Sequence, residues 1–322
     1  MEFGGISAIV LPVFALIGIG YGVSAFKVLP DTVGDAVGDF VFVIAIPVLV
    51  FKTLVTANFA GPSPWLLWLT YFTCVVAVWL LGDAIVRLVF KRDARAGLIG
   101  GISAAYGNTV LLGIPVVFAA YGEAGAIPFL LIISIHMPFM MVLSTVLMER
   151  AEVADGTKPA GDSVRQMAMR IVNSLARNPI VLGVIGSFLY RLTGLGFSGV
   201  PLAVAEKLAD AAAPCALFTL GMSLKRYGIR GNLPPALALS VLKLGVFPAL
   251  VWVVADRLAG LPPLWTAAAV ISAACPTGVN AYLIANRFRT GLALSANMIT
   301  LTTAFGVVTM GFWLSILQAY GR

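Results

Sequence analysis

Charged residues are scarce in this chain of 322 residues: Asp, Glu, Lys and Arg make up 11% of it, against 60% hydrophobic residues. A soluble domain carries about a quarter charged residues, so a soluble fold and a disordered chain are both excluded. The apolar runs last about twenty residues or more, which is the length a helix needs to cross a bilayer. A membrane barrel would instead alternate in segments of about ten residues. The composition therefore predicts an all-helical polytopic membrane protein.

Histidine and cysteine are also rare. His136 is the only histidine, and the three cysteines lie in apolar runs without a CxxC pair. A zinc site is therefore excluded, and no metal or other cofactor is expected. The net charge of +7 does not indicate nucleic acid, because the basic residues lie in short loops where membrane topology accounts for them.

The apolar pattern predicts ten spans, at residues 4–26, 32–54, 64–90, 94–120, 124–148, 178–193, 200–224, 233–258, 263–287 and 291–319. A polar linker at 149–165 and an amphipathic interfacial helix at 164–177 separate the first five spans from the last five. With the N-terminus outside, fifteen Lys and Arg residues fall on the inner side, five on the outer side and Lys243 within a span. Because basic residues gather on the cytoplasmic side, we expect a bacterial-type inner (plasma) membrane protein with both termini outside.

An internal repeat relates the two halves of the chain. Residues 102–105 and 271–274 both read ISAA, 169 positions apart, and the same shift superposes the other spans of the two halves. Since each half has five spans, the second half, 178–322, is inverted in the membrane relative to the first, 1–148. Inverted repeats are typical of transporters that work by alternating access, although channels also carry them.

The fourth and ninth spans each contain a helix breaker at the same place in the repeat. The shift of 169 maps Gly107 onto Pro276, and glycine and proline are the residues that best interrupt a helix. Small polar residues follow each breaker and supply partners for the freed backbone: Asn108, Thr109, Thr277, Gly278 and Asn280. The half-helix after each break presents its positive end at the membrane midplane, which favours an anion. The alternative is a pair of ordinary kinks.

These motifs resemble the auxin efflux carrier family, which includes plant PIN-type carriers and bacterial malonate and malate carriers. The resemblance covers essentially the whole chain and is most specific in the stretch NTVLLGIP, which runs from Asn108 to Pro115. Further matches lie in five places: Tyr121–Gly122, Asn178–Pro179, Pro214 to Leu224, Lys243 with Pro248, and CPTG from Cys275. Gly107 is a departure, because plant members usually have proline at the first break.

The resemblance implies a ten-helix fold related to sodium/proton antiporters and bile-acid symporters. Helices 4 and 9 would cross at their breaks, near Gly107, Pro115 and Pro276, and an organic anion would bind near the crossing. Helices 1–2 and 6–7 would form a scaffold, against which helices 3–5 and 8–10 would move as a transport domain in an elevator. The oligomeric state stays open, with a homodimer as one alternative.

Ionisable residues within spans are costly and therefore informative. Lys243, midway along the eighth span, could hold a carboxylate or serve as a structural tie. Asp39 follows Asp31 and Asp35 on one face of the second span, where it could carry a proton, pair with Lys243 or belong to a solvated helix start. The resemblance places His136 in the binding region, with a packed histidine as the alternative and an Asp–His proton relay as a further hypothesis. Asp83 and Arg87 are predicted to form a structural pair.

The broken spans contain no Asp or Glu, although sodium/proton antiporters of the related fold depend on acids at the midplane. Sodium/proton exchange is therefore disfavoured. An enzyme is disfavoured too, because no HExxH or suitable GxSxG motif is present. We expect a secondary transporter of a small organic anion, a dicarboxylate or an aromatic carboxylate, bound by Asn108, Thr109, Thr277, Gly278, Asn280 and His136. A sodium-coupled bile-acid-type symporter, with hydroxyls such as Thr302 and Thr303 as sodium ligands, and a channel remain alternatives.

Overall fold

The architecture is that of a computed structural model, which describes residues 3–57, 63–154, 176–229 and 233–320, with the single positions 156, 169, 172, 173 and 231. Most of the predicted interfacial helix at 164–177 and most of the predicted linker at 149–165 lie outside the described residues. The described residues are almost entirely helical, as expected of apolar segments that must satisfy their own backbone hydrogen bonds in hydrocarbon.

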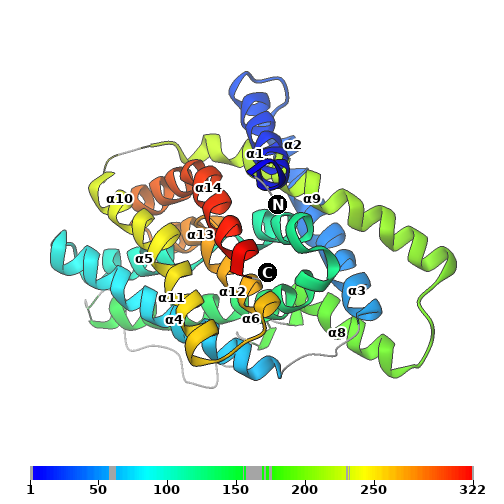
Figure 1. Ribbon diagram of the computed structural model, residues 1–322. Helices are drawn as coiled ribbons and strands as arrows, with labels where there is room; N and C mark the ends of the chain where they lie inside the picture. Colours follow the sequence, from blue (N-terminus) through cyan, green and yellow to red (C-terminus); the bar gives the residue numbers. More distant parts are fainter. Residues whose placement is uncertain are drawn as a thin grey trace.

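The helices follow one another with short connections (Figure 1). The α-helices are α1 Phe3–Ala25, α2 Asp31–Phe40, α3 Ile46–Thr56, α4 Pro64–Ala84, α5 Ala94–Ala105, α6 Ile114–Ala154, α8 Pro179–Leu192, α9 Gly199–Tyr227, α10 Leu233–Val241, α11 Phe247–Val253, α12 Pro263–Ala274, α13 Val279–Arg287 and α14 Leu292–Tyr320. Five π-helical turns join some of them: η1 Val41–Ala45, η2 Ile85–Val89, η3 Thr109–Gly113, η4 Leu242–Val246 and η5 Val254–Leu258.

Six helical stretches of the described chain are long and apolar enough to cross a membrane: Gly5–Ala25, Asp31–Thr56, Pro64–Val89, Thr109–Val153, Leu233–Leu258 and Leu292–Tyr320. The stretch from Thr109 combines parts of the predicted fourth and fifth spans, which meet at Gly122, where φ is 60°. Two shorter apolar helices, α8 and α12, add to these six. The chain is thus a multi-pass helical membrane protein, while the division into ten spans and the inverted repeat stay predictions.

Five helices, α1, α2, α3, α8 and α9, pack mainly against one another and are called the α1/α9 bundle here. Glycine allows the closest contacts in this bundle, because a Cβ atom at Gly20 would overlap the carbonyl oxygen of Phe218, and one at Gly221 would overlap that of Ile17. The backbones of α1 and α9 therefore touch. In Figure 1, α8 and α9 extend to the right of the view.

The remaining helices, α4, α5, α6 and α10–α14, form a second unit, called the crossing bundle here. Its closest backbone contact joins α4 to α5, where a Cβ atom at Gly101 would overlap the side chain of Trp79 and lie 2.6 Å from its carbonyl oxygen. Helices α4, α5 and α10 lie at the left of Figure 1, away from α8 and α9. Large side chains such as Trp79, Tyr71 and Phe129 are fully buried in this bundle.

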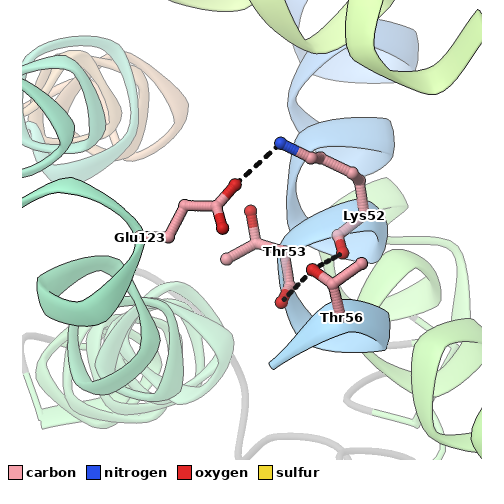
Figure 2. A network of polar contacts seen from close by, with 4 residues as sticks. All are labelled: Lys52, Thr53, Thr56 and Glu123. Carbon is pink, nitrogen blue, oxygen red and sulfur yellow. Dashed lines mark hydrogen bonds and ion pairs between the residues drawn. The ribbon is translucent and has the colours of Figure 1, made fainter. Parts of the chain in front are cut away.

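A salt bridge joins the two bundles. Lys52 on α3 approaches Glu123 on α6, with 2.7 Å between Nζ and Oε1, and Figure 2 shows the two side chains meeting across the gap between their helices. Glu123 directly follows Gly122, whose positive φ kinks α6 and begins a new helical direction. Three further ion pairs each lie inside one bundle: Asp83–Arg87, Asp35–Arg226 and Asp256–Arg257.

Candidate functional site

The first break interrupts the predicted fourth span between α5 and η3. Helix α5 ends at Ala105, Tyr106 is extended, and the chain becomes helical again at Thr109. Asn108 caps this second half, because its Oδ1 accepts a hydrogen bond from the backbone N–H of Leu111 at 3.2 Å. A cap of this kind satisfies one of the free donors at a helix start, so the residue after the breaker also stabilises the half-helix that follows.

The second break interrupts the predicted ninth span between α12 and α13. Helix α12 ends at Ala274, Cys275 and Gly278 are extended, and α13 begins at Val279. Gly278 is the N-cap of α13 and provides no side chain to bond the first N–H groups of that helix. Pro276 lies between them and cannot donate a backbone hydrogen bond.

The two breaks lie against each other, and residues 106–108 with 275–278 are called the crossing here. The N–H of Asn108 donates to the carbonyl oxygen of Pro276 at 2.7 Å, and the N–H of Gly278 donates to that of Tyr106 at 2.8 Å. Gly107 and Thr277 thus form an isolated antiparallel bridge. Backbone groups freed by the breaks are expensive to leave unpaired in hydrocarbon, and here they satisfy one another across the crossing.

Side chains strengthen this crossing. The Thr277 hydroxyl donates to the carbonyl oxygen of Ser103 at 2.8 Å, and the Thr277 N–H donates to Oγ1 of Thr302 at 2.9 Å. The amide of Asn280 donates to the Tyr106 hydroxyl at 2.9 Å. Thr277 therefore ties helices together with both of its donors, while Asn280, which is half-buried, keeps its amide oxygen for other partners.

Lys243 reaches the crossing from η4 and is fully buried. Its Nζ donates to the carbonyl oxygen of Ala273 at 3.0 Å, beside the end of α12, and lies 4.7 Å from the ring centre of Phe247. The C-terminal end of a helix carries partial negative charge that favours a cation. Gly107 lies close to this ammonium, since a Cβ atom at Gly107 would be 3.3 Å from Nζ. Lys243 is thus held by a helix end.

The suggested pair of Asp39 with Lys243 does not form. Asp39 is exposed on α2, whereas Lys243 is buried beneath the crossing, and no carboxylate of a described residue lies within 4.0 Å of its Nζ. The predicted structural pair of Asp83 and Arg87 is confirmed, with 3.3 Å between Oδ2 and Nη1.

His136 lies on α6 and is 1% exposed. Its ring packs edge-on against Tyr106 of the crossing, with 5.3 Å between ring centres, and against Tyr71 of α4 at 5.7 Å. Neither ring nitrogen has a hydrogen-bond partner among the described residues, so the hypothetical Asp–His relay is not formed here. Tyr71 and Tyr106 were not singled out from the sequence, although a tyrosine inside an apolar span needs a partner for its hydroxyl.

Several buried polar atoms without a protein partner lie at the crossing or in residues next to it. Within the described part of the chain these are Nδ2 of Asn108, both nitrogens of His136 and the hydroxyls of Tyr71, Ser103 and Ser272, while others, such as those of Thr53, Thr219 and Trp252, lie elsewhere. Each such atom costs about 1–3 kcal/mol when it is left unpaired, and native structures contain few of them. A group of polar atoms with free hydrogen-bonding capacity therefore surrounds the two breaks.

The other residues predicted for this site lie as follows. Thr109 is buried and opens η3 directly after Asn108. Pro115 is the second residue of α6 and lies within continuous helix, about two turns beyond the crossing. Within the described ranges, no three side chains of His, Cys, Asp or Glu gather as metal ligands would.

Comparisons with known proteins bear on the whole chain. The family model described as "Membrane transport protein" matches residues 6–314. A protein of Rhizobium meliloti (strain 1021) named "Putative malonate transporter" is 28% identical over 322 residues, which cover 98% of this chain and 96% of the relative. An uncharacterized transporter of Methanocaldococcus jannaschii is 23% identical over 315 residues, covering 95% of this chain and 96% of the relative. The match over nearly the full length shows that the chain belongs to this family of membrane transport proteins, the auxin efflux carrier family.

Proposed function

We propose that this membrane transporter is a secondary carrier of a small organic anion that binds at the crossing. The observation that carries the proposal is the group of unpaired polar atoms around two helix breaks, with the uncapped start of α13 among them. The free N–H groups and the positive end of a helix favour a carboxylate. In this site Asn108 and Asn280 contribute amide groups, and the ammonium of Lys243, which lies close to Gly107, adds positive charge.

A malonate-like dicarboxylate is the first substrate class to test, because the Rhizobium meliloti relative is named "Putative malonate transporter". The site also suits other small carboxylates, since its donors recognise the carboxylate group rather than the remainder of the molecule. The aromatic side chains of Tyr71 and Tyr106 supply an apolar wall that an aromatic carboxylate would contact.

Alternating access would come from movement of the crossing bundle against the α1/α9 bundle. Backbone-to-backbone contacts at Gly20, Gly221 and Gly101 lie within a bundle, where they hold its helices as one rigid unit. Between the bundles, the Lys52–Glu123 salt bridge is a contact between flexible side chains, which can break and form again. In this proposal the α1/α9 bundle is the scaffold, the crossing bundle is the transport domain, and both termini lie outside in a plasma membrane.

The first experiment measures binding to purified protein in detergent by thermal shift and calorimetry, over a panel of dicarboxylates, monocarboxylates and amines, with and without sodium. We expect carboxylates to stabilise the protein. Asn108→Ala and Asn280→Ala should each weaken binding about 10- to 100-fold, because a hydrogen bond to a charged group contributes about 1.5–3 kcal/mol.

Asn286→Ala is the matched control, because Asn286 lies on α13 as well but is exposed at the other end of the helix. This variant should bind like the wild type. Carboxylate binding that persists unchanged in Asn108→Ala and Asn280→Ala would overturn the site, and stabilisation by amines alone would overturn the anion. Saturable flux in proteoliposomes, with counterflow of the substrate, separates a carrier from a channel.

A further inference from the structure

Two basic side chains lie at or next to the crossing with no carboxylate of a described residue paired to either. His136 and Lys243 are both almost completely buried. Tyr71 links them, because its ring contacts both the ring of His136 and the ring of Phe247, over which the ammonium of Lys243 lies. Lys243 has a fixed partner in the carbonyl oxygen of Ala273, whereas His136 has none for either ring nitrogen among the described residues. Lys243 therefore has a hydrogen-bond partner in the protein, whereas His136 still needs one.

A bound anion can supply the hydrogen-bond partner that the ring nitrogens of His136 lack. A neutral imidazole has one donor and one acceptor, while the protonated ring has two donors and a positive charge. A protonated ring in these apolar surroundings needs a counter-charge, because an unpaired buried charge is very costly. A carboxylate bound at the crossing, where the imidazole packs against Tyr106, supplies both an acceptor and that counter-charge.

We propose that His136 binds a proton together with the substrate, so that anion and proton cross the membrane as a pair. The proton comes from the water on the side where the anion enters, resides on the imidazole while the carboxylate is bound, and leaves with it on the other side. The imidazolium and one carboxylate sum to zero charge, so binding adds no net charge to the moving bundle for a monovalent anion. This inference rests on the proposed function.

Other ionisable groups lie around His136. Tyr71 of α4 and Tyr106 at the first break pack against its ring, while Cys74 of α4, Cys275 at the second break and Lys243 of η4 lie farther out, around Tyr71 and the crossing. Phenols and thiols in general titrate well above neutral pH. Histidine is the side chain that ordinarily changes charge between about pH 5 and 8. Separate replacement of His136 and of Lys243, the other buried basic group, decides which of them takes the proton.

The test counts protons taken up when malonate, or the tightest carboxylate of the panel, binds to the purified full-length protein. Calorimetry in two buffers with different ionisation enthalpies gives this number directly. We expect uptake of about one proton per anion at a pH where the free histidine is neutral, and binding that weakens about tenfold per pH unit above that point. His136→Gln, which keeps a polar side chain, should bind without uptake and with a flat pH profile.

Ser134→Ala is the matched control on the same helix, because the Ser134 hydroxyl bonds only the carbonyl oxygen of Leu131. This variant should take up the proton as the wild type does. Binding without proton uptake in the wild type overturns the inference and leaves the proposed function standing, and this measurement does not depend on any variant folding. Uptake that survives in His136→Gln but disappears in Lys243→Gln also overturns it. If no carboxylate binds, the proposed function fails as well.

Discussion

Breaking the Lys52–Glu123 salt bridge should shift the equilibrium between the two positions of the crossing bundle. The pair spans the two bundles at 2.7 Å, with side-chain exposures of 18% for Lys52 and 58% for Glu123. Partly exposed ion pairs contribute about 0.2–1 kcal/mol, and 1 kcal/mol corresponds to about a fivefold change in an equilibrium constant. If the pair forms in only one position, Glu123→Gln should change the population ratio up to about fivefold.

The assay is the apparent substrate affinity in proteoliposomes, because apparent affinity depends on the fraction of the protein in the binding-competent state. Glu123→Gln and Lys52→Gln should change this affinity in the same direction, by up to about fivefold. The exchanged pair Lys52→Glu with Glu123→Lys should return it to within about twofold of the wild type, since it restores the attraction with the charges reversed.

Arg87→Gln is the matched control for these single variants and the exchanged pair. It breaks the Asp83–Arg87 pair, which lies inside the crossing bundle, and should leave the apparent affinity unchanged. Two results would refute the reasoning: an exchanged pair that behaves like the sum of the single variants, or a change in Arg87→Gln as large as that in Glu123→Gln. Either result would mean that the Lys52–Glu123 salt bridge does not control the equilibrium between the two positions of the crossing bundle.

Two further predictions concern stability and the crossing. Gly20→Ala should lower the melting temperature sharply, because its Cβ atom would overlap the carbonyl oxygen of Phe218, while Gly22→Ala, with no atom within 4 Å of its Cβ, should not; equal melting temperatures would contradict the close contact of α1 with α9. Tyr106→Phe removes the acceptor for Asn280, a loss of about 0.5–1.5 kcal/mol. It should weaken carboxylate binding by about 2- to 10-fold in calorimetry, whereas unchanged binding would show that this hydrogen bond does not position Asn280.

The membrane character and the places where helices are interrupted follow from local properties of the chain. Apolar runs of about twenty residues are long enough to cross a bilayer wherever they lie. Gly107 and Pro276 disturb a helix through their own backbone chemistry, and the helices end next to them, at Ala105 and Ala274. Asp83 and Arg87 are four residues apart on one helix, so their pairing also depends on local geometry alone.

The partners of the polar residues depend on the tertiary structure. Asn280 bonds Tyr106, and Thr277 bonds Ser103, across 174 residues of sequence, so nothing in the neighbouring sequence of either residue indicates the contact. The sequence offered Asp39 as a partner for Lys243, but the packing of η4 against the end of α12 places Lys243 on the carbonyl oxygen of Ala273.

The sequence by itself determined that this protein is a helical membrane protein with two helix breaks, because hydrophobic length and helix breaking are properties of short segments. Only the tertiary structure decided that the breaks bond each other, that Lys243 is held by a helix end and that no described residue bonds the ring nitrogens of His136. Those facts depend on which distant segments pack together, and in a chain this apolar many packings would bury the same surface. The few polar groups distinguish among them, because each buried polar group needs a partner.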